Sequence, residues 1–564
     1  MDKKVKGLNG PILNAYPDSV GGNLESMVEL LENKALENVF GGFYILPSVF
    51  NTDLDRGFSI IDYSINREIA SEDAIEKLKK ANIRLKLDFV LNHLSVLSSQ
   101  FQDILKNGKQ SKYADFFIDW NKFWDGKGQM TEAGFIQPDE KYLEKMFFRK
   151  PGLPILMVRM PDGTEVPYWN TFYQEVKYPT IDPEDVMKIC NVQYLMAKRI
   201  SELINSEINN GKTAKEISFG KYEKYKDDLT EYLESKRTYL GQMDLNINSP
   251  LVWEYYDETL KTLAKYGASI VRLDAFAYAP KEAGEKNFLN EPGTWELLTK
   301  IQDIADKYGV TLLPEIHASY SEKIYKTLAE KGYMVYDFFL PGILIDAIES
   351  GNGDTLVKWA NEIYENNMKT VNMLGCHDGI PLLDLKGLIP DERIEELIDI
   401  IVERGGYVKN LHGQKNMYYQ VNATYFSALG EDEDKLLLAR AIQMFMPGIP
   451  QVWYLDLFAG SNDYEAVKRA GAGGHKEINR SNLSKEEALN RLNNKGVARQ
   501  IELLRLRKTH RAFAEGAKMN ICADGNLLKI RWTNHEDYAE LNADLSRHKF
   551  TINASNMEGI IEKR

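Results

Sequence analysis

Short apolar runs that are typical of buried strands alternate with amphipathic helical patterns along most of the chain. The runs that predict strands are residues 11–16, 42–46, 84–91, 268–273, 310–314, 334–336, 371–375 and 451–454. Helical patterns lie between them, for example at residues 294–307 and 436–446. Eight strand candidates with intervening helices predict an α/β fold, the (β/α)8 TIM barrel.

Two early helices carry the clearest signals. Residues 23–33 place an apolar stripe at helical spacing, made of Leu24, Met27, Val28, Leu30 and Leu31. Residues 71–80 begin with Ser71, a good N-cap residue, and turn Ala74, Ile75 and Leu78 to one side. Both patterns predict helices that pack one face on the barrel.

Three stretches interrupt the alternation. About 170 residues separate the third and fourth strands, which is too long for a loop, so we expect an inserted B domain at 95–246. Within it, 173–241 is an extra polar segment with helices at 184–208 and 222–239. A second insertion at 379–430 follows the seventh strand. The barrel takes 1–94, 247–378 and 431–513, and the alternating, turn-rich residues 514–564 predict a small β domain.

Composition is that of a soluble globular protein, with 43% hydrophobic and 27% charged residues. The formal net charge of −13 disfavours non-specific nucleic-acid binding. It also means that an anionic substrate would need a local cationic pocket. The charged start is followed by no apolar h-region, and no apolar run approaches about 18 residues, so we expect neither a signal peptide nor a membrane span.

Three cysteines, Cys190, Cys376 and Cys522, are far apart and odd in number. This pattern predicts neither a disulfide framework nor a zinc site, and a reducing cytoplasm fits it best. No carboxylate cluster has the spacing of a calcium loop, so we expect no metal.

Reactive side chains follow or end several of the predicted strands. The segments are Asp88–His93, Gln242–Asn246, Arg272–Phe276, Leu313–His317 and Cys376–Asp378. Barrel enzymes place their chemistry at the C-terminal ends of the strands. We therefore expect these segments to meet at one mouth of the barrel.

Retaining cleavage of a glycoside needs a carboxylate nucleophile and a carboxylic acid about 5–5.5 Å apart. Asp274 and Arg272 share one face of a strand, so Arg272 can hold Asp274 ionised. Glu315 ends the next strand, where apolar surroundings would raise its pKa, as a general acid requires. Asp378 could grip sugar hydroxyls more tightly in the transition state. A single residue of this kind is usually a helix cap or part of a surface ion pair, so the hypothesis depends on the whole set of residues. Asp88 is expected to order the site and to take no part in the chemistry.

These five segments resemble the conserved regions of the α-amylase superfamily of retaining α-glucoside enzymes. The resemblance implies that Asp274 is the nucleophile, Glu315 the acid/base and Asp378 the transition-state stabiliser. It also implies that His93 and His377 bind glucosyl hydroxyls, and that Gln242–Asn246 closes the B domain.

Further segments resemble sucrose phosphorylase and its near relatives; they are 55–63, 272–278, 377–380, 419–429, 447–454, 459–463 and 478–480. The resemblance covers most of the chain except about 173–241, where the relatives are shorter. It implies a clamp of Asp55 and Arg480 on the far hydroxyls of the glucosyl unit, so that a single unit fits. It further implies that Phe58 stacks on the sugar and that Tyr278, His317 and Gln420 face the acceptor.

The same resemblance implies inorganic phosphate as a co-substrate and no cofactor. Arg149 and Lys150 match a loop that supplies a cation to phosphate, and Tyr419 and Gln420 match residues that alternate between phosphate and fructose. The Arg149–Lys150 pair is open to two other readings, a solvated basic turn or a site for a second phosphate on the acceptor sugar. At Tyr418 the relatives usually carry a bulkier aliphatic residue.

The leading interpretation is conversion of sucrose and phosphate to α-D-glucose 1-phosphate and fructose through a β-glucosyl-enzyme. Sucrose 6'-phosphate is the alternative donor, because Arg149 adds a charge beside the acceptor. Glucosylglycerate or glucosylglycerol phosphorylase is a more distant variant. Another alternative is a hydrolase or transglucosidase, which would use water or a sugar as acceptor. The non-enzymatic alternative is a barrel that only binds carbohydrate, and the intact carboxylates Asp274, Glu315 and Asp378 argue against it.

The expected partners are small-molecule sugars and phosphate, without nucleic acid or membrane. The extra segment at 173–241 has three open uses, namely a homodimer contact, a wall of the acceptor site or a solvated decoration.

Overall fold

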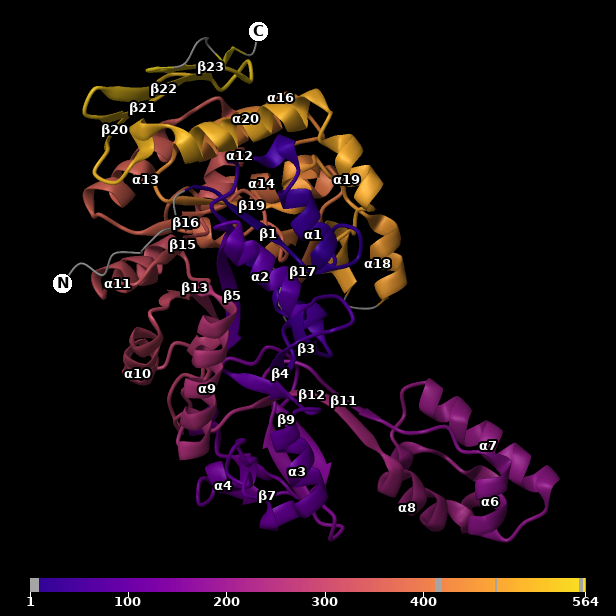
Figure 1. The fold of residues 1–564 in the computed structure, drawn as a ribbon. Coiled ribbons are helices and arrows are strands. Elements are labelled where there is room, and N and C mark those ends of the chain that lie inside the picture. The colour runs from indigo at the N-terminus through magenta and orange to yellow at the C-terminus, as the bar shows by residue number, and fades with distance from the viewer. Residues whose placement is uncertain (1–9, 411–417, 472–473, 557–560, 563–564) are drawn as a thin grey trace.

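A barrel of parallel strands forms the body of the computed structural model, which describes residues 10–410, 418–471, 474–556 and 561–562 (Figure 1). In this part of the chain one eight-stranded sheet has the order β14-β13-β5-β2-β1-β19-β16-β15. Its strands are β1 (Ile12–Ala15), β2 (Gly42–Ile45), β5 (Arg84–Val90), β13 (Ala268–Asp274), β14 (Thr311–Pro314), β15 (Val335–Asp337), β16 (Thr370–Asn372) and β19 (Ile449–Trp453). Neighbours follow chain order and pair in parallel, and the barrel nearly closes between β14 and β15. The predicted fold class and strands are confirmed.

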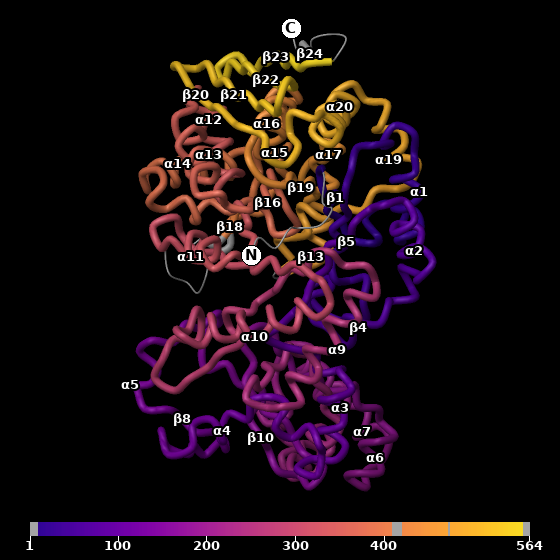
Figure 2. Tube along the Cα trace, turned by 60° about the vertical axis from the view of Figure 1, so that its left-hand side comes forward, coloured from indigo at the N-terminus to yellow at the C-terminus, as the bar shows by residue number. Residues whose placement is uncertain are grey.

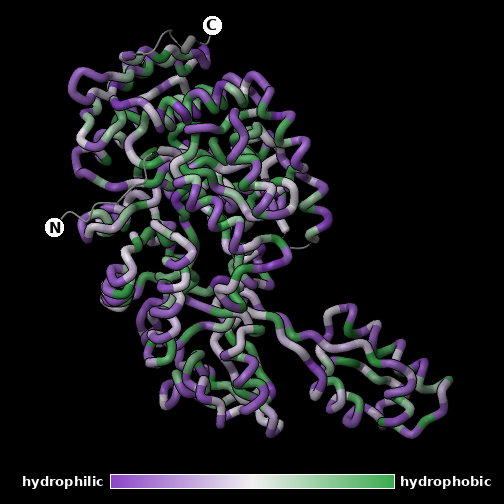
Figure 3. The backbone as a smooth tube through the Cα atoms, in the orientation of Figure 1, coloured by the Kyte–Doolittle hydropathy of each residue, from purple (hydrophilic) through white to green (hydrophobic). Residues whose placement is uncertain are grey.

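Helices cover the outside of the barrel, and hydrophobic positions gather along the strands inside it (Figure 3). They include α1 (Leu24–Leu31), α2 (Glu72–Lys80), α9 (Pro250–Tyr266), α10 (Gly293–Tyr308), α11 (Ile324–Glu330), α12 (Leu340–Ser350), α13 (Asp354–Glu365), α16 (Glu433–Phe445), α17 (Tyr454–Leu457), α18 (Tyr464–Ala470), α19 (Lys485–Arg491) and α20 (Lys495–Thr509). Ser71 caps α2 by accepting a hydrogen bond from the Ala74 backbone N–H, as predicted. No helix in the described part of the chain is long and apolar enough to cross a membrane.

The first insertion follows β5 and packs on its own aromatic cluster. It contains β6 (His93–Ser95), α3 (Ser99–Asn107), α4 (Trp120–Phe123), β7 (Gly128–Met130), β8 (Ile136–Pro138), α5 (Glu140–Leu143), β9 (Ile155–Arg159) and β10 (Glu165–Trp169). Trp120, Trp124 and Trp169 are each buried in this cluster. The chain returns along β12 (Thr238–Asp244), which pairs with β6. This pairing sets Asp244 opposite His93 at the end of β5.

A helical arm stands away from the barrel on a two-stranded stalk (Figure 1). Strand β11 (Gln174–Lys177) and β12 form the stalk, and α6 (Pro183–Cys190), α7 (Tyr194–Asn209) and α8 (Lys226–Lys236) form the arm. A separate apolar core, which includes Ile200 and Leu229, holds these helices together. Two expectations were wrong here. The predicted helix at 184–208 is split, because Asn191 adopts a left-handed φ of 50°, and the helix predicted to reach residue 239 gives way to β12.

Deleting the arm is expected to leave the rest of the chain folded. Lys177 and Thr238 are cross-strand partners, so an Asn-Gly turn can join them in place of residues 178–237. Because the arm has its own core, the remainder should keep one cooperative melting transition within about 5 °C of the full chain. A matched contrast is Trp120→Ala, which removes a fully buried indole and should cost about 3–5 kcal/mol. Loss of cooperativity in the arm deletion would contradict this division.

The second insertion lies between β16 and α16. It contains η9 (Leu383–Leu385), α14 (Asp391–Glu403), β17 (Tyr407–Asn410), β18 (Tyr418–Asn422) and α15 (Tyr425–Ala428). Ile380 and Val421 exchange backbone hydrogen bonds of 2.9 and 3.0 Å, which ties β18 to the chain just after Asp378. The insertion therefore brings its strand β18 to the edge of the barrel mouth.

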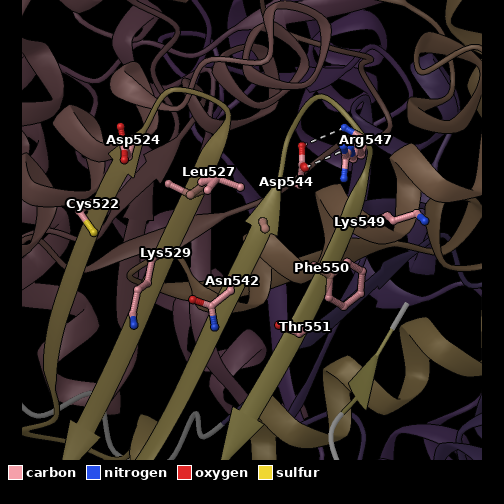
Figure 4. A pocket seen from close by; sticks show the side chains of 12 residues that line it. Cys522, Asp524, Leu527, Lys529, Asn542, Asp544, Arg547, Lys549, Phe550 and Thr551 are labelled. Atoms are coloured by element: carbon pink, nitrogen blue, oxygen red, sulfur yellow. Dashed lines mark hydrogen bonds and ion pairs between the residues drawn. The ribbon is translucent and has the colours of Figure 1, made fainter. Parts of the chain in front are cut away.

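The C-terminal residues form an antiparallel sheet above the ends of α16 and α20 (Figure 2). It consists of β20 (Lys518–Asp524), β21 (Leu527–Asn534), β22 (Asp537–Asp544), β23 (Lys549–Ala554) and β24 (Ile561–Glu562). Trp532 Nε1 donates a 2.7 Å hydrogen bond to the Phe445 carbonyl at the end of α16. The outer face of this sheet carries a shallow hollow of about 520 Å³, lined by residues such as Leu527 and Lys529 (Figure 4). None of the side chains predicted to do chemistry lines it.

Candidate active site

Arg272 lies at the centre of the carboxylate cluster at the barrel mouth. Its Nη1 is 2.5 Å from Asp88 Oδ1 and 3.0 Å from Asp274 Oδ1, and its Nη2 is 2.6 Å from Glu315 Oε1. Parallel pairing of β5 with β13 sets Asp88 level with Arg272. Tyr44 also donates to Asp88 at 3.0 Å. Asp88 therefore orders the guanidinium, and the guanidinium spans the two carboxyls.

One guanidinium beside three buried carboxyls leaves an excess of negative charge. Burial raises the pKa of Asp274 well above its usual value, and Glu315 adds to this effect. Burial alone would also raise the pKa of Glu315, but Arg272 and the nearby His317 outweigh it and hold that pKa below its usual value. The raised pKa expected for Glu315 was wrong, because its surroundings are cationic and not apolar. Arg272 and His317 therefore favour the ionised form of Glu315, whereas burial disfavours the ionised form of Asp274.

Asp378 contacts one histidine and two cationic side chains at the barrel mouth. Its Oδ2 is 3.1 Å from His377 Nε2, and its Oδ1 is 2.5 Å from Lys476 Nζ and 3.5 Å from Arg480 Nη2. Burial alone would raise the pKa of Asp378, but His377 and Lys476 hold it well below the usual value. Asp378 is therefore a fixed negative charge facing the other two carboxyls.

The structure brings together the two residues of the predicted clamp, Asp55 and Arg480. Arg480 Nη1 is 4.0 Å from Asp55 Oδ1, and Arg480 Nε donates to the His377 carbonyl at 2.9 Å. Asp55 and Arg56 both adopt left-handed φ angles near 49° and 48°. The tight turn needs Gly57, since a Cβ there would lie 2.4 Å from the Ser48 backbone nitrogen.

Phe58 and the two predicted histidines form one wall of the site. The Phe58 ring stacks on His377 with centroids 5.0 Å apart and an interplanar angle of 12°. The Phe58 carbonyl is 3.0 Å from His93 Nε2 and accepts a 3.2 Å hydrogen bond from Gln242 Nε2. Burial lowers the pKa of His93, so His93 is neutral and suited to hydroxyl groups. These contacts link the B-domain strand β12 to the barrel.

His317 lies between Glu315 and the second insertion. Its Nε2 is 3.6 Å from Glu315 Oε1 and 3.3 Å from Gln420 Nε2, while its Nδ1 is 2.9 Å from Asp384 Oδ2. Burial opposes a charged imidazole, but Asp384 outweighs it and raises the pKa of His317 to about 9. The predicted residue Tyr419 belongs to β18, and its side chain lies outside the described residues.

Arg149 and Lys150 come from the B domain, and Arg149 contacts Tyr278, which follows β13. Arg149 Nη1 donates to the Tyr278 hydroxyl at 2.9 Å, and its guanidinium lies 4.8 Å from the centre of the Phe172 ring. Lys150 Nζ donates to Asn170 Oδ1 at 2.8 Å. Burial lowers the pKa of Lys150 to about 8. Because Phe172 also packs on His93 at 4.9 Å, Arg149 is one ring away from the glucosyl side of the site.

Three contacting residues were missed by the sequence analysis. Lys476 binds Asp378, Asp384 binds His317, and Lys281 is buried with its Nζ 2.7 Å from Asp244 Oδ2 and 3.0 Å from Asn92 Oδ1. Each lies within a few residues of a recognised motif in the sequence. A single Lys or Asp outside the motif forms no pattern that would have identified it. Among the described residues no group of three or more His, Cys, Asp or Glu could hold a metal ion.

Comparison with known proteins gives consistent relatives over the whole chain, although no family model matches it. A sucrose 6(F)-phosphate phosphorylase from Ilumatobacter coccineus is 49% identical over 96% of this chain and 95% of that relative. A sucrose phosphorylase from Streptococcus mutans is 30% identical over 90% of this chain and 89% of that relative. The crystal structure of sucrose 6F-phosphate phosphorylase from Thermoanaerobacter thermosaccharolyticum matches with a TM-score of 0.79 and 33% identity, covering 99% of this chain and 98% of that one.

Proposed function

We propose that this chain, which belongs to the sucrose phosphorylase family of the α-amylase superfamily, transfers the glucosyl unit of sucrose 6'-phosphate to inorganic phosphate. Relatives that are phosphorylases of the glycosyltransferase type support phosphorolysis. The relatives that are 49% and 33% identical to this chain are named as phosphorylases of sucrose 6F-phosphate. The relative that is 30% identical is named as a phosphorylase of sucrose. Plain sucrose, the leading interpretation from the sequence, is therefore less well supported than the alternative donor.

The position of Arg149 is the observation that carries the choice of donor. Its guanidinium is held by the Tyr278 hydroxyl at 2.9 Å and by the Phe172 ring. A planar guanidinium pairs bidentately with phosphate oxygens. His317 is a second cation, 3.6 Å from the acid/base candidate Glu315. The site thus offers one cation for the phosphate on the acceptor sugar and another for the attacking phosphate.

The first half of the reaction breaks the bond between glucosyl C1 and the fructosyl oxygen. The Asp274 carboxylate attacks C1, and the carboxylic acid of Glu315 gives its proton to the leaving oxygen. This step requires Glu315 to carry the proton and Asp274 to be ionised. Protonated Glu315 donates a hydrogen bond to the glycosidic oxygen, and Arg272 Nη1, 3.0 Å from Asp274 Oδ1, stabilises the Asp274 carboxylate.

The second half transfers the glucosyl unit to phosphate. An oxygen of H2PO4⁻ attacks C1, the bond from C1 to Asp274 breaks, and the phosphate proton passes to the Glu315 carboxylate. The products are glucose 1-phosphate, the Asp274 carboxylate and protonated Glu315, so charge and protons balance. Two displacements at C1 retain the α configuration. Asp378, held ionised by His377 and Lys476, binds the sugar hydroxyls more tightly as the ring flattens.

The test of this proposal is the phosphate dependence of turnover with sucrose 6'-phosphate. We expect glucose 1-phosphate to form only when phosphate is present, and the first product seen by NMR to be the α anomer. β-Glucose 1-phosphate as the first product would contradict the double displacement. Free glucose released at the same rate without phosphate would contradict the phosphorylase and leave a hydrolase on the same barrel.

A further inference from the structure

We propose that Asp384 is a positioning residue that holds His317 as a cation and thereby makes phosphate, and not water, the preferred attacking group. The inference rests on the proposed phosphorolysis, because it concerns the second half of that reaction. It assigns a part in the reaction to a residue in the insertion after β16, outside every motif that the sequence analysis recognised.

The orientation of the His317 imidazole is fixed on two sides. Its Nδ1 is 2.9 Å from Asp384 Oδ2, and its ring stacks on Phe338 with centroids 3.9 Å apart and an angle of 25°. The His317 and Asp384 side chains are 6% and 8% exposed, so water does not screen the pair strongly. With Nδ1 and one face occupied, the Nε2 edge is turned toward Glu315 Oε1 at 3.6 Å and the Gln420 amide at 3.3 Å.

The charged groups around His317 come from three elements. Glu315 follows β14, and Asp384 belongs to η9 with Glu322 of η8 (Tyr320–Glu322) acting on Asp384 from behind. Gln420 of β18 is neutral. Burial alone would discharge the imidazole, but the two carboxylates on opposite edges raise the pKa of His317 to about 9. Burial also raises the pKa of Asp384 itself, and His317, 2.9 Å away, offsets part of that rise.

An imidazolium at this place changes which group can attack the glucosyl ester. After the first half of the reaction Glu315 is a carboxylate, which repels a phosphate anion but not a water molecule. A proton on His317 Nε2, aimed at Glu315, offsets that charge and gives the phosphate a hydrogen-bond donor. Removing the Asp384 charge would discharge His317 near neutral pH and restore the repulsion, so phosphate binding should suffer more than attack by water.

Asp384→Asn tests this with α-D-glucosyl fluoride as donor, because fluoride leaves without a proton from Glu315. We expect the KM for phosphate to rise at least about tenfold, and the ratio of glucose 1-phosphate to free glucose at fixed phosphate to fall at least about tenfold. In the wild type, kcat/KM for phosphate, calculated on the concentration of H2PO4⁻ at each pH so that the ionisation of phosphate itself is removed, should fall as pH rises through about 9, the pKa of His317. In the variant the fall should move toward about 6.5, the ordinary histidine value. Asp391→Asn, a change of an exposed aspartate at the start of α14, is the matched control.

The outcomes separate this inference from the proposed function. Wild-type turnover that ignores phosphate would overturn the proposed function itself. The inference alone would be overturned if the wild type depends on phosphate but Asp384→Asn does not differ from it. The variant would then have the wild-type KM for phosphate, the wild-type product ratio and the wild-type fall of kcat/KM with pH. Asp384 would be a packing residue. If Asp384→Asn does not fold, His317→Gln replaces it. In that variant the ratio of glucose 1-phosphate to free glucose should fall by the same factor, and kcat/KM for phosphate should show no fall near pH 9. Retention of either wild-type property would count against the proposal.

Discussion

Asp274→Ala is expected to lower kcat for glucose 1-phosphate formation by about 10⁴- to 10⁶-fold. The substitution removes the group that attacks C1, whereas Arg272 keeps its contacts with Asp88 and Glu315. Initial rates with sucrose 6'-phosphate and phosphate measure the loss. Because Asp274 is a buried carboxyl beside other carboxyls, its removal should not lower the melting temperature, and an unchanged or higher value would locate the loss in the chemistry.

A small anion should partly replace the missing carboxylate. In Asp274→Ala, azide can enter the space that the side chain leaves and attack α-D-glucosyl fluoride from the same face. The expected product is β-glucosyl azide, formed by a single displacement. Asp274→Asn is the matched control, since its amide fills the space and excludes azide. Full activity in either variant would show that another group is the nucleophile.

Arg149→Leu is expected to lower kcat/KM for sucrose 6'-phosphate by about 10- to 150-fold, the value of a lost charge-assisted hydrogen bond of about 1.5–3 kcal/mol. The same change should alter kcat/KM for plain sucrose less than about threefold, because that donor has no phosphate on the acceptor sugar. The comparison of the two donors separates a lost phosphate contact from damage to the site.

The matched control for Arg149→Leu is Arg67→Leu, an exposed arginine after β4 (Ile60–Ile65). It should leave both rates unchanged within error. Equal losses for the two donors in Arg149→Leu would instead assign Arg149 to the attacking phosphate, which both reactions use. If kcat/KM does not fall with either donor, Arg149 is part of a solvated basic turn and does not bind phosphate.

The barrel could be predicted from the sequence because its strands are buried on both faces and stand out as apolar runs. Parallel strands then fix where their C-terminal ends meet, so Arg272, Asp274 and Glu315 were expected together before any distance was known. The arm was harder to predict. Its residues 184–208 have helical spacing throughout, and only the left-handed backbone of Asn191 divides α6 from α7, a choice that tertiary packing makes.

The electrostatics of the site could not be read from the sequence. Whether Glu315 lies among apolar or cationic groups depends on the side chains of Arg272 and His317, which approach it across the barrel mouth. Lys476 reaches Asp378 from 98 residues away, and Asp384 reaches His317 from 67 residues away. Such contacts depend on how insertions fold over the barrel, and no local pattern predicts them.

The most direct test is kcat/KM for sucrose 6'-phosphate against that for sucrose, both at saturating phosphate, with glucose 1-phosphate as the measured product. The Arg149 contact predicts a preference for sucrose 6'-phosphate of at least about tenfold. Equal or better use of plain sucrose would contradict the proposed donor and leave Arg149 and Lys150 to the attacking phosphate.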